Sequence, residues 1–300
     1  MARRAPHPAV SAGLAFALAL GLSPAAASAA EAAPLALTRP DAGTARPAVP
    51  YRMAALGDSI TRGYNSCGWF FDCVRRSWAT GSYGGIDSHY LRLRARNGAL
   101  AAHNNAVTGA KVAMLAGQAD AAVSQRAEYV TILIGANDAC TSTVAGMTSV
   151  AAYEARFRAG MQTLRDGLPS ARIFVSSIPD LRWLWRAGRD NRAARAAWSR
   201  LRVCQSMLTD PISTDIEDVE RRRDVRRRVI AYNEVMGRVC AQDARCRFDD
   251  GAVFSHPFTL DQVSRWDYFH PNARGQATLA RVTYAKSFWS AAALARRRDA

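Results

Sequence analysis

The chain has 300 residues, of which 49% are hydrophobic and 22% are charged. This is enough for one large domain or two small ones with a buried core, and it excludes a chain that is disordered throughout. No repeat of fixed period is visible, which argues against a solenoid or a propeller. The formal net charge is +15, and Lys111 and Lys286 are the only lysines. Such a charge favours contact with anionic surfaces, although a GC-rich coding bias toward arginine also explains it.

The first 29 residues predict a secretory signal peptide. Arg3 and Arg4 make its start positive, residues 14–22 form a short apolar segment, and small residues ending at Ala29 offer a cleavage site. The apolar segment is too short for a permanent membrane span. We therefore expect a secreted protein that is cleaved after Ala29, with an uncleaved anchor as the alternative. Residues 30–48, rich in Ala and Pro, predict a flexible leader.

The six cysteines agree with export, because oxidising compartments favour disulfides. Six cysteines allow fifteen pairings. Two pairs share the same short spacing, which favours two local loop closures and leaves the remaining two cysteines for each other. No cysteine–histidine cluster has the spacing of a zinc site, so no metal is expected. The hypothesis is therefore three disulfides, Cys67–Cys73, Cys140–Cys204 and Cys240–Cys246.

The main domain is predicted to alternate strands and helices. Continuous apolar segments predict buried, parallel strands at residues 52–56, 129–134 and 172–177. Periodic segments between and after them predict helices at residues 88–96, 111–123, 150–168 and 273–289. This alternation indicates one three-layer α/β domain over residues 49–290, followed by a basic tail at 291–300.

Residues 181–228 differ in composition from the rest of the domain. Arginines occur in two clusters, at 221–223 and 226–228, with interleaved acidic residues. The mixed signs predict a solvated helix with i,i+4 ion pairs, continuing to about Val239, rather than a nucleic-acid surface. The tryptophans between 183 and 198 predict either core packing or an apolar wall for an acyl chain. The segment is also a candidate lid.

Four short segments follow predicted strands, where the active residues of an open α/β sheet gather. They are Gly57-Asp58-Ser59-Ile60, the stretch 104–109, Gly135-Ala136-Asn137-Asp138 and the stretch 267–272. Taken singly, a serine after a strand is usually a helix cap, and a lone histidine is usually structural. Together and in this order, they supply a nucleophile, oxyanion donors, an orienting acid and a base.

This set of segments resembles the SGNH (GDSL-type) hydrolase family over most of residues 51–289. The matching residues are Ser59 in block one, Gly109 in block two, Asn137 in block three, and Asp267 and His270 in block five. Ile60 stands where the family usually has leucine. The resemblance implies a three-layer, flavodoxin-like sandwich with a central parallel sheet, and ester cleavage without a metal or another cofactor.

The segments Ser77–Gly81 and Ile132–Gly135, together with Cys140, look like the secreted lipase and phospholipase B branch of the family. Secreted bacterial members of this branch often carry three disulfides paired in sequence order, which is the pairing that the spacing favours.

The roles that follow are those of a serine esterase. His270 takes the proton of Ser59, Asp267 orients His270, and the Gly109 N–H, the Asn137 side chain and the Ser59 N–H hold the oxyanion. Asp58 is expected to shape the turn, and Asp138 to brace the Asn137 loop. Of the other histidines, His89 is expected to be structural and His103 solvated. His256 has no acidic residue three positions before it.

The leading functional hypothesis is a secreted, monomeric esterase that acts on lipid esters and makes transient contact with a membrane or cell-wall surface. One alternative is a carbohydrate esterase that removes acetyl groups from polysaccharide, because a fold does not define a substrate. Another is a protein without catalytic activity that binds an anionic envelope polymer. Nucleic acid is not an expected partner, because no recognition motif is present.

Overall fold

The structure is a computed structural model that describes residues 48–290. The predicted signal peptide, all but the last residue of the predicted leader, and the basic tail lie outside the described residues. Within residues 48–290, none of the helices combines the length and apolar character that a bilayer span requires.

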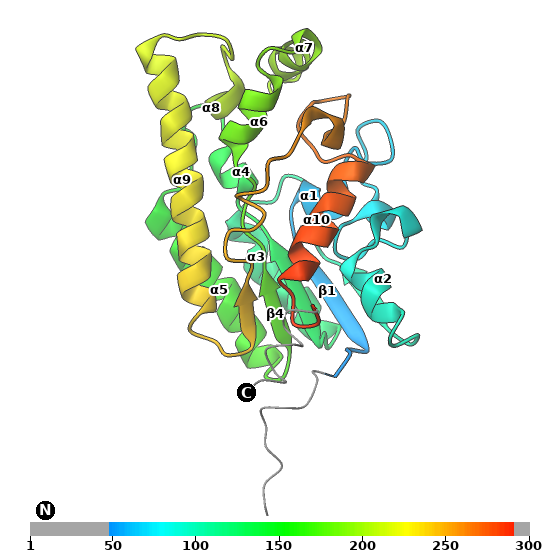
Figure 1. The fold of residues 1–300 in the computed structure, drawn as a ribbon. Coiled ribbons are helices and arrows are strands. Elements are labelled where there is room, and N and C mark those ends of the chain that lie inside the picture. The colour runs from blue at the N-terminus through cyan, green and yellow to red at the C-terminus, as the bar shows by residue number, and fades with distance from the viewer. Residues whose placement is uncertain (1–47, 291–300) are drawn as a thin grey trace, which may run out of the picture. The chain divides into compact units, whose positions relative to one another are not determined.

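A five-stranded parallel sheet forms the centre of the domain (Figure 1). The strand order is β2-β1-β3-β4-β5. The central strand is buried along its whole length, as its apolar, β-branched sequence predicts. The strands are β1 (Arg52–Gly57), β2 (Ala101–Asn104), β3 (Tyr129–Leu133), β4 (Arg172–Val175) and β5 (Cys246–Phe248).

Helices cover both faces of the sheet, so the predicted three-layer α/β sandwich is confirmed. In Figure 1, α2 (His89–Arg94) and α10 (Ala273–Ala285) lie in front of the sheet. Behind the sheet lie α3 (Leu115–Ser124) and α5 (Val150–Gly167), and α9 (Ile216–Cys240) packs against α5. The 3₁₀ helices are η1 (Val74–Arg76), η2 (Gly84–Ile86), η3 (Val112–Met114), η4 (Val144–Gly146) and η5 (Leu260–Gln262).

The front layer is joined to the sheet through His89. Its Nδ1 lies 2.8 Å from the Tyr129 hydroxyl of β3, and its Nε2 lies 2.8 Å from the Thr283 hydroxyl of α10. Burial lowers the pKa of His89 to about 3, so the ring is neutral. The prediction that His89 is structural is therefore confirmed.

The back layer depends on close helix contact. A Cβ atom on Gly160 of α5 would lie 2.6 Å from Leu115 Cγ of α3, so only glycine fits there without displacement. On its other side, α5 stacks Tyr153 on Tyr232 of α9, with 4.0 Å between the ring centroids. These contacts hold three helices of the layer together.

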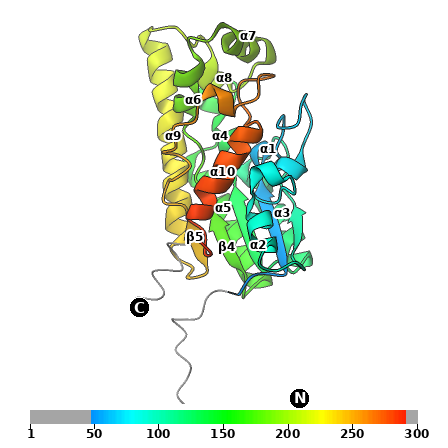
Figure 2. The ribbon, with the colours of Figure 1, turned by 45° about the vertical axis from the view of Figure 1, so that its right-hand side comes forward.

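Residues 181–240 form four helices rather than one. They are α6 (Leu181–Gly188), α7 (Arg192–Leu201), α8 (Gln205–Leu208) and α9, and Figures 1 and 2 show α6, α7 and α8 gathered at one end of the sheet. The side chains of Asp180 and Asn191 cap α6 and α7, which explains the interruptions.

The closest ion pairs within α9 join residues three apart, not four apart as predicted. The arginines four positions after Asp218 and Asp224 bind backbone carbonyl oxygens instead, Arg222 those of Asp210 and Ser213, and Arg228 that of Thr148. The pairs are Asp218–Arg221, Glu220–Arg223 and Asp224–Arg227.

Two of the three tryptophans between 183 and 198 are core residues. Trp185 and Trp198 are buried, and only Trp183 is 38% exposed. The indole N–H of Trp198 donates to the carbonyl oxygen of Tyr268 at 3.0 Å. Helix α7 is therefore packed onto the loop that carries Asp267 and His270, and of the two predicted alternatives Trp185 and Trp198 follow core packing.

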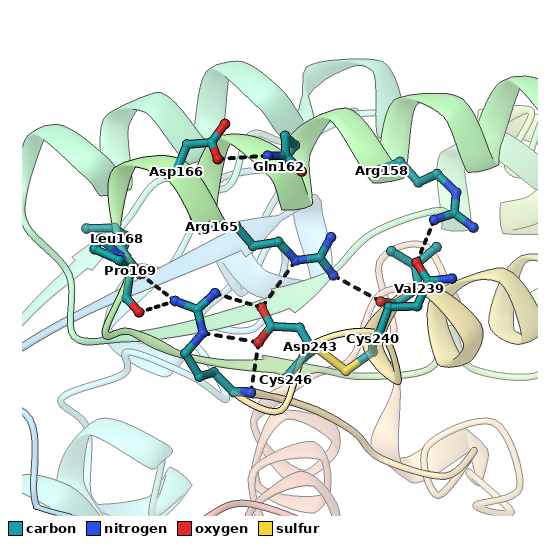
Figure 3. Close-up of polar contacts among 12 residues, drawn as sticks. Arg158, Gln162, Arg165, Asp166, Leu168, Pro169, Val239, Cys240, Asp243 and Cys246 are labelled. Carbon is teal, nitrogen blue, oxygen red and sulfur yellow. Dashed lines mark hydrogen bonds and ion pairs between the residues drawn. A yellow bond between two sulfur atoms is a disulfide. The ribbon is translucent and has the colours of Figure 1, made fainter.

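Three disulfides join Cys67 to Cys73, Cys140 to Cys204, and Cys240 to Cys246, as the spacing predicts. Figure 3 shows the last of them, which closes the turn between α9 and β5. Asp243 in this turn accepts from Arg165 of α5 at 3.2 Å and from Arg245 at 3.1 Å. Burial raises the pKa of Asp243, but the hydrogen bonds from Arg245 and Arg165 outweigh it and hold the pKa below its usual value. Strand β5 is thus attached at the edge of the sheet.

Candidate active site

Ser59 is placed by the turn that follows β1. Gly57 has φ = +147°, and a Cβ atom there would collide with the carbonyl oxygen of Leu133 on the neighbouring strand. Asp58 then caps the short helix α1 (Ser59–Arg62), because its Oδ1 accepts from the Ile60 N–H at 2.9 Å. Ser59 therefore lies at the first helical position, at the carboxyl end of β1.

His270 lies beside Ser59, although 211 residues separate them in the chain. The distance from His270 Nε2 to Ser59 Oγ is 2.9 Å, and the distance from His270 Nδ1 to Asp267 Oδ2 is 2.7 Å. Because Asp267 accepts from Nδ1, Nε2 is left to accept the hydroxyl proton of Ser59. The structure thus brings together the three residues that the sequence predicts as nucleophile, base and acid.

Asp267 is held from several sides. Its Oδ1 accepts from the backbone N–H groups of Phe269 and His270, at 2.9 and 3.1 Å. Its Oδ2 accepts from the Asn65 side chain at 2.5 Å, in addition to His270. Burial raises the pKa of Asp267, but the hydrogen bond to His270, the charge of His270 and the two backbone donors outweigh it and leave the pKa below its usual value. Asp267 is therefore a carboxylate at neutral pH.

The predicted oxyanion donors lie at the same edge of the sheet. Gly109, with φ = +83°, follows β2, and the Val107 N–H before it donates to the Gly57 carbonyl oxygen at 3.1 Å. Asn137 lies in α4 (Ala136–Ala139), directly after β3, and its Nδ2 donates to the Ala110 carbonyl oxygen at 3.0 Å. This bond uses one of the two amide protons of Asn137 and leaves the other for a ligand.

The backbone N–H groups of Ser59 and Gly109 donate no hydrogen bond within residues 48–290. These two backbone N–H groups and the second amide proton of Asn137 are thus unused donors at the edge of the sheet where Ser59 lies.

Two buried carboxyl groups stand beside these residues. Asp138 accepts from the Val112 N–H at 2.8 Å and from the Thr148 hydroxyl at 2.7 Å, so it ties the Asn137 loop to two other segments. Asp58 Oδ2 is buried and has no hydrogen-bond partner within the part of the chain that the structure describes. Burial raises the pKa of Asp58 to about 7. The hydrogen bond from the Ile60 N–H and the charge of His270 lower this pKa, but burial has the larger effect. Both residues have structural contacts of the kind that the sequence predicts.

The competing histidines lie elsewhere. His103 is on the edge strand β2, opposite Ala54 of β1, and it is half-buried rather than solvated. His256 packs edge-on against Phe258, and burial and the charge of Arg281 lower its pKa. Among the described histidines, only His270 is bonded to Ser59.

Asn65 is a site residue that the sequence does not reveal. It has a left-handed backbone, with φ = +60°, and it is bonded both to Asp267 and to the Phe70 N–H. Nothing in the local sequence distinguishes it from a surface asparagine in a turn, because its partner lies 202 residues away.

Within the described residues, no group of three or more His, Cys, Asp or Glu side chains could hold a metal ion.

The sequence matches the GDSL-like Lipase/Acylhydrolase family over residues 55–278. The chain therefore belongs to this family, and it is a carboxylic ester hydrolase of the SGNH type. None of the proteins with curated functions matches it.

Among solved structures, the chain is similar to a catalytic mutant of the acetylxylan esterase Axe2 from Geobacillus stearothermophilus, with 17% identity and a TM-score of 0.49. That match covers 80% of this chain and 94% of the other. It is also similar to an extracellular lipase from Streptomyces rimosus, with 17% identity, a TM-score of 0.43, and 79% and 99% of the two chains covered. Neither similarity identifies a substrate for this chain.

Proposed function

We propose that this protein is an exported serine esterase that hydrolyses lipid esters, in the manner of a lipase, a phospholipase A or a lysophospholipase. The observation that carries the proposal is the hydrogen-bonded series from Ser59 Oγ to His270 Nε2 and from His270 Nδ1 to Asp267 Oδ2. A serine hydroxyl becomes a nucleophile when such a base removes its proton.

The proposed reaction has two stages. His270 takes the proton of Ser59 as Oγ attacks the ester carbonyl carbon, and the N–H groups of Ser59 and Gly109 with the Asn137 amide stabilise the oxyanion. His270 then gives the proton to the leaving alcohol, which breaks the ester bond and leaves an acyl-Ser59. In the second stage His270 takes a proton from water as the water oxygen attacks the acyl carbon. His270 then gives this proton to Ser59 Oγ, which breaks the acyl bond, releases the acid and restores Ser59. Asp267 stabilises the imidazolium that forms in each stage.

Exposed aromatic side chains beside this site support a lipid substrate. Trp69 is 67% exposed and Trp266, the neighbour of Asp267, is 40% exposed. Large apolar side chains at the entrance of a site suit a substrate with acyl chains.

A carbohydrate acetyl esterase is the second candidate, and the size of an apolar pocket favours it. The pocket has a volume of about 50 Å³ and is lined by residues adjacent in the chain to Ser59, Asn137 and His270, namely Ile60, Ala136, Phe269 and Pro271. Pockets for whole small molecules are typically about 300–1,000 Å³, so this one suits a short acyl group.

Export is supported by the predicted signal sequence and by the three disulfides. A monomer is proposed as the form in solution.

The test is hydrolysis of p-nitrophenyl esters from acetate to palmitate by the oxidised protein, with Ser59→Ala as the control. We expect a maximum at medium or long chains, and a fall in kcat of about a thousandfold or more in the variant, because the nucleophile is lost. A maximum at acetate would instead favour the carbohydrate esterase.

Near-normal turnover by Ser59→Ala would refute the proposed nucleophile. If no ester is cleaved and a fluorophosphonate probe leaves Ser59 unlabelled, the proposal of a serine esterase fails, and the role of a polymer-binding protein is favoured.

A further inference from the structure

Three exposed aromatic side chains in contact, Trp69, Phe70 and Trp266, together with Phe71, the next residue in the chain, are here called the aromatic tip. Trp69, Phe70 and Phe71 are 67%, 41% and 51% exposed. Trp69 stacks on Trp266 with 5.9 Å between the ring centroids, and it lies 6.5 Å from Phe70. Isolated exposed apolar residues are ordinary, but a contiguous group indicates a surface that meets something apolar.

The loop that carries the aromatic tip is held in place. The Cys67–Cys73 disulfide closes it, and the Phe70 N–H donates to Asn65 Oδ1 at 2.6 Å. Phe70 has φ = +51°, a conformation that a bulky residue adopts only when its surroundings impose it. The exposed rings therefore stand on a fixed backbone.

The same loop borders the catalytic residues on two sides. On one side Asn65 is bonded to Asp267, whose neighbour is Trp266 of the aromatic tip. On the other side Asp72 accepts from the hydroxyl of Thr108, the residue before Gly109, at 2.5 Å. If the aromatic tip binds to a surface that carries ester groups, those ester groups therefore lie close to Ser59.

Positive charge stands next to the aromatic tip. Arg265 lies over the Trp266 ring, 5.4 Å from its centroid, and Arg75, which follows the disulfide loop in the chain, lies over the Tyr83 ring, 5.6 Å from its centroid. Both arginines are exposed, and neither pairs with a carboxylate in residues 48–290. The exposed charge of Arg265 beside Trp266 complements the negative head groups of an anionic lipid surface, and the exposed rings complement its acyl chains.

The polar side chains of the loop favour lipid over sugar. Asp72 is bonded to Arg62 and Thr108, and Asn65 to Asp267 and Phe70. Asn65 is buried, and both carboxylate oxygens of Asp72 are already bonded within the protein, so neither side chain is an open partner for the hydroxyl groups of a polysaccharide. Phe70 and Phe71 offer only hydrocarbon.

We infer that the aromatic tip is the surface by which this protein docks onto an anionic lipid surface, and that docking delivers substrate to Ser59. The inference rests on the proposed function, because it names where a lipid-hydrolysing enzyme would meet its substrate.

Vesicle binding tests the inference without using activity. The oxidised Ser59→Ala protein is sedimented with vesicles of phosphatidylcholine alone and of phosphatidylcholine with about equal parts of phosphatidylglycerol. We expect tighter binding to the anionic vesicles, and a loss of at least about tenfold in affinity when Trp69→Ser and Phe71→Ser are added, because two large apolar side chains no longer enter the lipid.

Ile212→Ser with Ile216→Ser is the matched control, since these side chains are 64% and 69% exposed and lie just before α9 and at its first position. We expect this control to bind vesicles as its parent does. Circular dichroism and thermal unfolding confirm that each variant is folded.

Equal loss in both double variants, or equal binding of the parent to neutral and anionic vesicles, would overturn the inference. So would binding to insoluble xylan, but not to vesicles, that depends on Trp69 and Phe71. A wild-type protein that cleaves long-chain esters but binds no vesicle refutes only the docking surface. A protein that binds vesicles through the aromatic tip but cleaves no ester refutes only the proposed function.

Discussion

At the scale of single residues, Asp58 has an unusual environment for a carboxyl group next to a nucleophile. One oxygen caps α1, and the other is buried without a partner within the described residues. An ionised carboxylate with an unsatisfied buried oxygen is costly, which is why burial raises the pKa of Asp58 to about 7. A neutral Asp58 can still cap the helix, because Oδ1 remains an acceptor.

This pKa makes the stability of the protein depend on pH. Between about pH 4 and pH 7 the unfolded chain loses the Asp58 proton and the folded chain keeps it, so the contribution of this group to folding falls as pH rises. We expect Asp58→Asn to remove this dependence. From pH 4 to pH 7 the free energy of unfolding of the variant, relative to that of the wild type, should rise by on the order of 3 kcal/mol.

Urea unfolding at several pH values measures the difference between the two proteins. A difference that stays constant from pH 4 to pH 8 would mean that Asp58 is already ionised at the lower pH in the folded state.

Among the site residues, Ser59, Asp267 and His270 could be predicted because each stands in a short motif after a strand or before a helix. Asn65 could not be predicted in the same way. Its function as a partner of Asp267 depends on a fold that brings residues 65 and 267 together. A local sequence does not encode such a contact.

At the scale of elements, the disulfides differ in the length of chain that they close. Cys140–Cys204 joins residues 64 apart and connects the end of α4 to the start of α8, whereas Cys240–Cys246 joins residues six apart. A longer loop loses more conformational entropy in the unfolded chain when it is closed. Cys140–Cys204 therefore contributes more to the stability of the folded protein than Cys240–Cys246.

We expect replacement of Cys140 and Cys204 by serine to lower the free energy of unfolding by about 2 kcal/mol more than replacement of Cys240 and Cys246. Both variants bury the same kind of side chain, so each is the control for the other. Denaturant unfolding of the oxidised proteins measures the effect. Equal losses would contradict this account of loop entropy.

The strands show which elements a sequence reveals. β1, β3 and β4 are interior strands with continuous apolar segments, and they were predicted within two residues of their observed ends. β2 and β5 are edge strands of four and three residues, without fully buried positions. Because half-exposed edge strands carry polar side chains, no apolar run marks them.

The helical segment after β4 was the least accurate prediction. Charge pattern alone predicted one long helix, whereas caps at Asp180 and Asn191 divide the segment. The capping residues are visible in the sequence, but Asp and Asn are also common on helix surfaces. Trp185 of α6 and Trp198 of α7 are both buried, so each helix packs one face against the rest of the domain. This packing depends on tertiary contacts.

At the scale of the whole molecule, the proposed export determines where the mature chain begins. We expect the protein, produced in a secretory bacterial host with its own leader, to appear outside the cell with Ala30 as its first residue, because signal peptidases cleave after a small residue such as Ala29. The intact mass of the oxidised protein measures this. A membrane-bound protein of full-length mass would indicate an uncleaved anchor instead.

The class of fold, the family and the residues proposed for catalysis can all be inferred from the amino-acid sequence. Apolar periodicity records which segments are buried, and a catalytic chemistry requires particular side chains in particular motifs. The tertiary structure decided which distant residues meet: Asn65 with Asp267, and Trp69 with Trp266. It also decided which tryptophans are buried and which are exposed. These outcomes depend on contacts between segments far apart in the chain, and the energy of such a contact is not contained in either segment alone.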